Sequence, residues 1–423
     1  LLGVPLAGWS AWWALREIVA SPWVRAWACI AYALLPAMTG AIASGRIGTV
    51  VAVVLFPLAA RSLMRALGWA TPPLKAPSGR TPWTAALLAT FCIACSPILW
   101  LAVLFICVAA AIRSGRTGAG WVPMIVRGCI IALVPLILLL PWSAYALTHP
   151  LVLLTEQGLN DPAMTQPLAS PLSIALLQPG GPGAIPIWAS AGIVIAAVLA
   201  LLRPDRRVAI TWAWGIAVGA LIVALALSRV SFSLPGVAGT QVPWPGMATL
   251  VLGASLIVAA ALAGDGIRGT VASATFGYRQ PLVAVGALAA VASMVACAIF
   301  WLPGSGDPLR RGDPSVLPPF VGAEAMGPQA PRTLLLQAGQ SGSVDYTLVN
   351  GSGPTLGDAE TAPNSQVWAP LDAMVGGLVS GRGGDEVAGL AGYAVRYVIL
   401  VNGADAPGLV RTLDSVPGMR RVA

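Results

Sequence analysis

A single arginine separates two apolar runs near the start of the chain. Residues 34–63, LLPAMTGAIASGRIGTVVAVVLFPLAARSL, place Arg46 in a short turn of small residues, Ser44-Gly45-Arg46-Ile47-Gly48. A guanidinium group can hold two phosphate oxygens at once through its parallel N–H donors. Arg46 is therefore a candidate contact for the phosphate of a lipid-linked substrate. The alternative is an arginine at a helix end whose side chain extends to the lipid headgroups.

Three further candidates lie in residues 148–185, the longest connection between apolar segments. This connection contains His149, the sole histidine of the chain, and the acidic residues Glu156 and Asp161. Long loops without clear structure are often functional. We predict that His149, Glu156 and Asp161 contribute to substrate binding together with Arg46. A role of either carboxylate as a general base or metal ligand is a further hypothesis, and carboxylates in solvent are the alternative.

Residues for several other chemistries are missing from the sequence. The membrane segments carry no paired-carboxylate motif, no GxSxG with a partner histidine is present, and one histidine cannot build a typical zinc site. Cys92 and Cys95 form a CxxC inside an apolar run that has no histidine or acidic neighbour. We interpret these two thiols as packing residues rather than a metal or redox pair.

The segments that position these residues are apolar. The chain is 57% hydrophobic and 9% charged, whereas soluble domains carry about 25% charged residues. Runs of about 20 apolar residues recur, the length that a helix needs to cross roughly 30 Å of hydrocarbon. The sequence predicts a polytopic α-helical membrane protein with about nine or ten transmembrane or re-entrant helices. The apolar runs fall near residues 1–15, 24–44, 47–66, 83–112, 124–147, 186–202, 208–228, 246–264 and 281–302.

Basic residues indicate the orientation of these segments. Sixteen lysines and arginines precede Pro303, and fourteen of them fall in loops that share one side if the segments cross in turn. Short cytoplasmic loops carry such an excess, so we predict a multi-pass protein of the cell membrane with these loops inside. Arg46 and Arg229 are the two exceptions. Because orientation explains the basic excess, we expect no nucleic-acid partner.

Residues 83–112 are flanked by basic residues at both ends, and this orientation places both ends on the cytoplasmic side. The segment must therefore enter the membrane and return. Ser96-Pro97 in its middle is a suitable break, because proline removes a backbone donor and disfavours helix at the residue before it. We predict two short or re-entrant helices. The alternative is one long tilted helix followed by a basic outer loop.

The last part of the chain has a different composition. We divide the chain into a membrane domain over residues 1–302, a linker rich in proline, glycine and aspartate over residues 303–330, and an extracytoplasmic α/β domain over residues 331–423. Alternating strands and helices in about 100 residues are typical of a small α/β domain. The strands are predicted at residues 332–337, 344–349, 394–402 and 419–422, with helices at residues 370–381, 385–393 and 407–418.

Several stretches together resemble one family. They are PLAGWSAWWALREIVASPWVRAWACIAYALLPAMTGAIASGRIGTVVAVVLFPLAA, LLTEQGLNDP, QPGGPGAIP, GDGIRGTVASATFGYRQP and LAGYAVRYVILVNGADAPGLVRTLDSVPGMRRV. The chain resembles the C-terminal membrane part of large actinobacterial glycosyltransferases, in which a cytoplasmic family 2 glycosyltransferase domain precedes a multi-spanning region. Residues 1–66 also look like the spans of C-type enzymes, which use polyprenyl-phosphate sugars. We interpret the chain, which begins Leu-Leu-Gly, as the C-terminal portion of a longer protein.

The resemblance implies glycosyl transfer at the membrane, in the assembly of cell-envelope glycan or glycolipid. Membrane lipids, a polyprenyl-phosphate-linked sugar and an envelope glycan acceptor are the implied partners. The nucleotide-sugar domain with its metal-binding aspartates is absent from this sequence, and so is the acidic first external loop of C-type enzymes. No catalytic residue is therefore carried over, and we expect no cofactor in this segment, with a divalent metal left to the full-length enzyme.

Two other functions remain as alternatives. One is a transporter or flippase for a lipid-linked sugar, and the other is a non-catalytic membrane scaffold whose C-terminal domain binds envelope partners. Transporters often show inverted repeats and charged residues at the middle of the bilayer. The sequence has no detectable internal repeat and no acid deep within an apolar run, which favours the glycosyltransferase.

Overall fold

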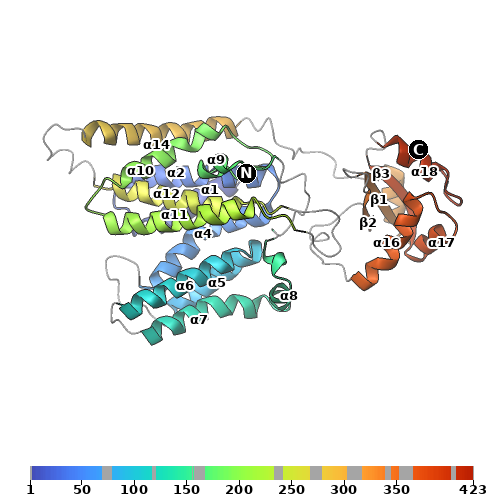
Figure 1. The fold of residues 1–423 in the computed structure, drawn as a ribbon, viewed down its shortest axis with the longest axis horizontal. Coiled ribbons are helices and arrows are strands. Elements are labelled where there is room, and N and C mark those ends of the chain that lie inside the picture. Colours follow the sequence, from blue (N-terminus) through green and yellow to red (C-terminus); the bar gives the residue numbers. More distant parts are fainter. Residues whose placement is uncertain are drawn as a thin grey trace. The chain divides into compact units, whose positions relative to one another are not determined.

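The computed structural model describes residues 2–68, 79–116, 121–154, 156, 167–232, 242–266, 279–302, 317–338, 344–351, 365–401 and 406–422. The chain divides near residue 310 into two compact units, which Figure 1 shows as a helical unit and a smaller unit that contains a sheet. We call these the helical unit and the sheet unit.

Within the described residues, six helical segments are long and apolar enough to cross a membrane. This agrees with the predicted helical membrane protein. They are α2 (Pro22–Ala33) with α3 (Pro36–Ala43), α4 (Ile47–Ala66), α7 (Trp121–Leu138), α11 (Arg207–Leu227), α12 (Gly246–Gly264) and α14 (Arg279–Trp301). The shorter elements are α1 (Gly3–Leu15), α5 (Thr81–Cys95), α6 (Leu99–Arg116), α8 (Trp142–Thr148), η1 (Pro150–Leu154), α9 (Pro171–Ala175), η3 (Ile187–Ser190) and α10 (Ala191–Ala200).

The helix over residues 83–112 is interrupted at Ser96-Pro97, as the sequence predicted. Helix α5 ends at Cys95, Ser96 has an extended backbone with φ −147° and ψ 93°, and α6 begins at Leu99. Ala85 near the start of α5 and Ala110 near the end of α6 belong to one buried cluster. In a single continuous helix these two alanines would lie about 37 Å apart. The segment therefore turns back on itself, and one long tilted helix is excluded.

The interior of the helical unit is built from small residues. At Gly192 in α10, an added Cβ would lie 2.0 Å from the carbonyl oxygen of Ala289 in α14, so only glycine lets these helices approach so closely. Small residues at helix contacts are typical of membrane proteins. Large apolar side chains instead cover the outer surface, as expected where the solvent is lipid. Among them are Phe91, Phe105, Ile222 and Leu288, which are all exposed.

The two ends of the helical unit differ in charge. Arginines gather at one end: Arg61 and Arg65 contact Glu17, Arg206 contacts Asp265, and Arg203 donates to the carbonyl of Ala263. We call this the arginine-rich end, and we call the opposite end the Arg46 end. Because the 20 residues of α4 separate Arg46 from Ala66, the two ends lie about 30 Å apart.

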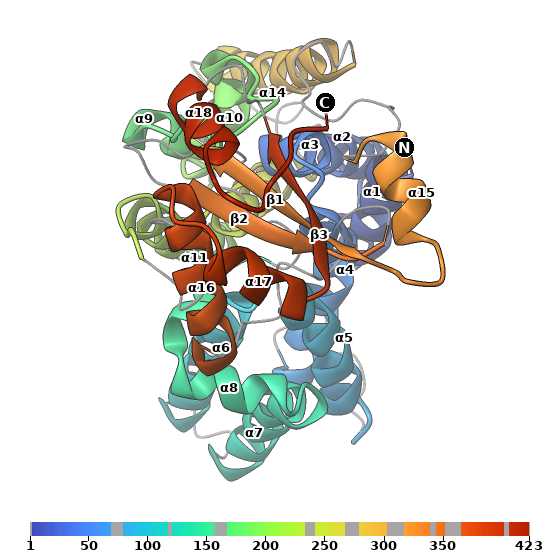
Figure 2. The same cartoon turned by 90° about the vertical axis from the view of Figure 1, so that its right-hand side faces the viewer.

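The described residues of the sheet unit contain a three-stranded sheet of order β2-β1-β3 (Figure 2). Strand β1 (Arg332–Ala338) pairs antiparallel with β2 (Val344–Val349) and parallel with β3 (Val395–Val401). Leu334 and Leu336 point to one face, where they join a core that includes Leu371 and Leu378 of α16 (Ser365–Val379). The remaining helices are α15 (Pro319–Ala325), α17 (Asp385–Gly392) and α18 (Pro407–Asp414).

The sheet unit differs from the sequence prediction at both of its ends. Helix α15 lies within the predicted linker, and its Val321 packs with Leu317 and Leu335 on the second face of the sheet. The predicted strand at residues 419–422 is wrong, because these residues form no strand. Gly418 turns the chain with φ +89°, and Met419 packs onto the first face instead of pairing at an edge.

Candidate functional site

Arg46 lies where the chain turns sharply between α3 and α4. Gly45 takes φ +69°, a left-handed conformation that suits glycine, and the Arg46 amide donates to the Ala41 carbonyl at 2.9 Å. Arg46 then caps the start of α4. Its side chain is 3% exposed. The guanidinium therefore turns into the protein and does not extend toward the lipid headgroups.

Two side chains from distant segments meet this guanidinium. Arg46 Nη1 donates to Glu156 Oε2 at 2.5 Å, and the Glu156 side chain is 9% exposed. The guanidinium carbon lies 4.5 Å from the ring centroid of Trp244, a cation–π contact. Glu156, two residues after η1, and Trp244, two residues before α12, therefore both meet at the turn before α4. We call Arg46, Glu156 and Trp244 the Arg46 site.

Glycines hold the indole of Trp244 in place. An added Cβ at Gly246 would lie 1.9 Å from the ring, and one at Gly40 would lie 3.6 Å from it. The indole N–H donates to the Gly180 carbonyl at 2.9 Å. Gly180 belongs to QPGGPGAIP and has φ +76°. This glycine-rich stretch thus positions an aromatic ring against the Arg46 guanidinium. Its sequence has no phosphate-binding signature.

Burial governs the electrostatics of the Arg46 site. Burial raises the pKa of the Glu156 carboxyl above its ordinary value, although the charge of Arg46 and its hydrogen bond oppose the rise. A buried ion pair of this kind contributes little net stability, but removal of one partner costs about 3–5 kcal/mol. Arg46 and Glu156 therefore each depend on the other to compensate a buried charge.

The structure brings two of the four predicted site residues together. Arg46 and Glu156 pair, whereas His149 is exposed and stacks on Tyr145 with 4.4 Å between ring centroids. His149 Nδ1 lies 3.0 Å from Thr148 Oγ1. Within the part of the chain that the structure describes, His149 forms no hydrogen bond or ion pair with Arg46 or Glu156. Asp161 lies outside the described residues.

Sequence reasoning missed Trp244. The signal was present in PWPG at residues 243–246, where a tryptophan between two prolines directly precedes an apolar span that begins with glycine. An aromatic residue at such a point stands at the membrane interface. Its partner could not be inferred, since Arg46 lies about 200 positions earlier.

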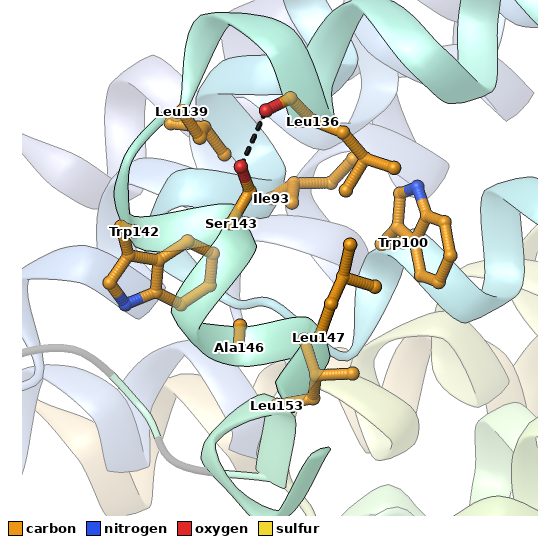
Figure 3. Close-up of a pocket in the computed structure, with 9 residues that line it drawn as sticks. All are labelled: Ile93, Trp100, Leu136, Leu139, Trp142, Ser143, Ala146, Leu147 and Leu153. Atoms are coloured by element: carbon orange, nitrogen blue, oxygen red, sulfur yellow. Dashed lines mark hydrogen bonds between the residues drawn. The ribbon is translucent and has the colours of Figure 1, made fainter. Parts of the chain in front are cut away.

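A small apolar pocket has one lining residue, Leu153, that is close in sequence to Glu156 of the Arg46 site (Figure 3). Trp100, Trp142 and Leu147 line it, and Leu153 of η1 closes one side. The Ser143 hydroxyl in its wall donates to the Leu136 carbonyl at 2.6 Å. Leu153 is three residues before Glu156, so one short segment carries both a wall of the pocket and the carboxylate of the ion pair.

Over the described ranges, no three histidine, cysteine or acidic side chains are grouped closely enough to hold a metal ion. Comparison with models of known protein families, with curated proteins and with solved structures finds no match to this chain.

Proposed function

We propose that this chain is the membrane portion of a glycosyltransferase that acts in cell-envelope glycan or glycolipid assembly. In this proposal the Arg46 site positions the phosphate of a polyprenyl-linked sugar or acceptor. The observation that carries the proposal is a guanidinium buried against Trp244 and Glu156 at the end of the helical unit that lies opposite the arginine-rich end. The family resemblance of the sequence supplies the class of reaction.

The charge difference between the two ends supports an orientation in the cell membrane. Arginine-rich loops stay on the cytoplasmic side, so the Arg46 end faces the envelope. Trp301 at the end of α14 and Val4 at the start of α1 pack against one buried cluster, so α14 ends at the Arg46 end. The sheet unit follows α14 in the chain and is therefore extracytoplasmic in this proposal.

The chemistry of the Arg46 site suits an anion that arrives from outside. A phosphate competes with Glu156 for the N–H donors of Arg46, while the face of the guanidinium stays on Trp244. Burial already favours the neutral carboxylic acid of Glu156. The carboxyl can thus take a proton as the phosphate arrives, and the like charges do not repel each other. Positioning of this kind requires little reorganisation.

Binding of a polyprenyl phosphate to the full chain in phosphatidylcholine nanodiscs tests the proposal. Arg46→Gln is expected to weaken binding about tenfold, the loss of one charge-assisted hydrogen bond. Arg229→Gln is the matched control, because Arg229 also lies at the Arg46 end but is exposed. Equal effects of the two variants would remove the special role of Arg46.

A second measurement tests the reaction. Membranes with the full-length enzyme are supplied with a labelled polyprenyl-phosphate sugar, and label in envelope glycan is measured. Arg46→Gln is expected to lower incorporation, and Arg229→Gln to leave it unchanged. Movement of the labelled lipid between leaflets without incorporation would instead assign the protein to the transporters.

A further inference from the structure

A second charged cluster lies at the arginine-rich end, far from the Arg46 site. Glu17 follows α1 and meets two arginines of the last turns of α4. Arg61 Nε donates to Glu17 Oε1 at 2.9 Å, and Arg65 Nε donates to Glu17 Oε2 at 3.0 Å. The Nη2 atoms of both arginines also contact Glu17 Oε1. We call Glu17, Arg61, Arg65 and Trp13 the Glu17 cluster.

The charges in this cluster do not balance. One carboxylate serves two guanidinium groups, and the exposed Arg16 is adjacent in sequence. Burial alone would raise the pKa of Glu17, but hydrogen bonds from Arg61 and Arg65 hold it below its ordinary value. The carboxylate therefore stays ionised at neutral pH, and the cluster keeps an excess of one positive charge.

One donor of the cluster lacks an acceptor. Arg61 is 9% exposed, and its Nη1 is buried without a hydrogen-bond partner among the residues described. A buried guanidinium N–H without an acceptor is unfavourable. The neighbouring pair at this end is balanced by contrast, since Asp265 accepts from the Ser21 amide at 2.9 Å and from Arg206 at 3.3 Å. Within the Glu17 cluster, the open donor is Arg61 Nη1.

Tryptophan places the cluster at the level of the lipid headgroups. The Arg61 guanidinium carbon lies 3.7 Å from the ring centroid of Trp13, and Trp13 is 42% exposed. Trp9, one turn earlier on α1, is 65% exposed. Tryptophan is enriched at membrane–water interfaces, where its apolar body and its polar N–H both find suitable surroundings. A ligand that reaches Arg61 past Trp13 therefore comes from the membrane surface.

We propose that the Glu17 cluster binds the phosphate of an anionic membrane lipid through Arg61 Nη1 and Arg65. A phosphodiester offers acceptor oxygens to the open donor and neutralises the excess charge. Its acyl chains then run along the apolar outer surface of α1. Basic pockets between helices on the cytoplasmic side are a recurrent site for such headgroups. This site is separate from the Arg46 site and lies at the other end of the helical unit.

Native mass spectrometry of the detergent-purified full chain tests this proposal. Equal amounts of phosphatidylglycerol and phosphatidylcholine are added, and the lipids that stay bound are counted. The wild type is expected to retain phosphatidylglycerol in preference, and Arg61→Gln to retain about tenfold less of it. Arg229→Gln also removes one positive charge but lies at the opposite end, so it is expected to match the wild type. Equal retention by the two variants would overturn the proposal.

Thermal unfolding of the wild type gives an answer that needs no variant. A ligand of the folded state raises the melting temperature in proportion to the logarithm of its concentration. Phosphatidylglycerol is expected to raise it, and inorganic phosphate at the same concentration to have little effect. An equal rise with inorganic phosphate would overturn the assignment to a lipid and favour a free anion. Absence of a rise with both would overturn the site.

Discussion

The Glu156 carboxylate lies 2.5 Å from Arg46 Nη1, although 110 residues separate the two in the chain. The pair joins the turn before α4 to the segment after η1, and Trp244 adds the segment before α12. Three connections at one end of the helical unit are therefore tied to one guanidinium. A ligand that displaced Glu156 from Arg46 would release the segment after η1 from this end, while the contact with Trp244 could remain.

Removal of Glu156 should destabilise the fold more than removal of the whole pair. Glu156→Leu leaves the buried guanidinium without its carboxylate, at an expected cost of about 3–5 kcal/mol. The double variant Arg46→Leu with Glu156→Leu should recover most of this loss. Thermal unfolding in detergent measures both, and Arg229→Leu, at an exposed position, should change stability by less than about 0.5 kcal/mol. A double variant no more stable than Glu156→Leu would contradict the buried pair.

Glu156 and Glu17 should give opposite pH dependences. Because the pKa of Glu156 is raised above 4.5 in the folded state, the folded chain binds this proton more tightly than the unfolded chain does. Stability from Glu156 is therefore lost as pH rises from 4.5 through its raised pKa. The pKa of Glu17 is lowered, so its contribution is lost only as pH falls below 4.5.

This difference separates the two groups by experiment. Melting temperatures of the wild type and Glu156→Gln, measured from pH 4.5 to about pH 7, should diverge, with a negative slope in the wild type that Glu156→Gln lacks. Below pH 4.5 both proteins should lose stability together because both retain Glu17. Parallel curves above pH 4.5 would show that Glu156 does not titrate as its burial requires.

Gly246 should tolerate no side chain. An alanine Cβ would lie 1.9 Å from the Trp244 ring, so Gly246→Ala must move the indole from beneath Arg46. The expected cost is about 1–3 kcal/mol, as for other overpacked positions. Gly215→Ala is the matched control, because no atom lies within 4 Å of its added Cβ, and it should stabilise α11 by up to about 1 kcal/mol. Equal melting temperatures for the two variants would contradict the packing of Trp244.

Local signals in the sequence were sufficient for several elements. The break at Ser96-Pro97 was predictable because proline acts on its own helix and on the residue before it. The strand Val395–Val401 was predictable from a mostly apolar run that is rich in β-branched residues. Composition was sufficient for the apolar helices, since a length of about 20 residues is set by the bilayer.

Contacts between distant segments were not predictable in this way. Glu156 and Asp161 looked equivalent in the sequence, and no local rule selects the carboxylate that pairs with Arg46. The exposed position of His149 depends on its stacking on Tyr145, which the spacing of four residues allowed but did not require. Helix α15 was not predicted, because it has few apolar residues and these are buried only by contact with a face of the sheet.

Two exposed arginines at opposite ends of the helical unit give a direct test of orientation. Arg16 follows α1 at the arginine-rich end and Arg229 follows α11 at the Arg46 end, and both are exposed. In a background without native cysteines, a membrane-impermeant thiol reagent added to intact cells should label Arg229→Cys and not Arg16→Cys. The reason is that arginine-rich loops remain on the cytoplasmic side during insertion. Asn350→Cys in the sheet unit should label with Arg229→Cys. Labelling of Arg16→Cys instead would place the Arg46 site in the cytoplasm, out of reach of an envelope acceptor, and the proposed function would fail with it.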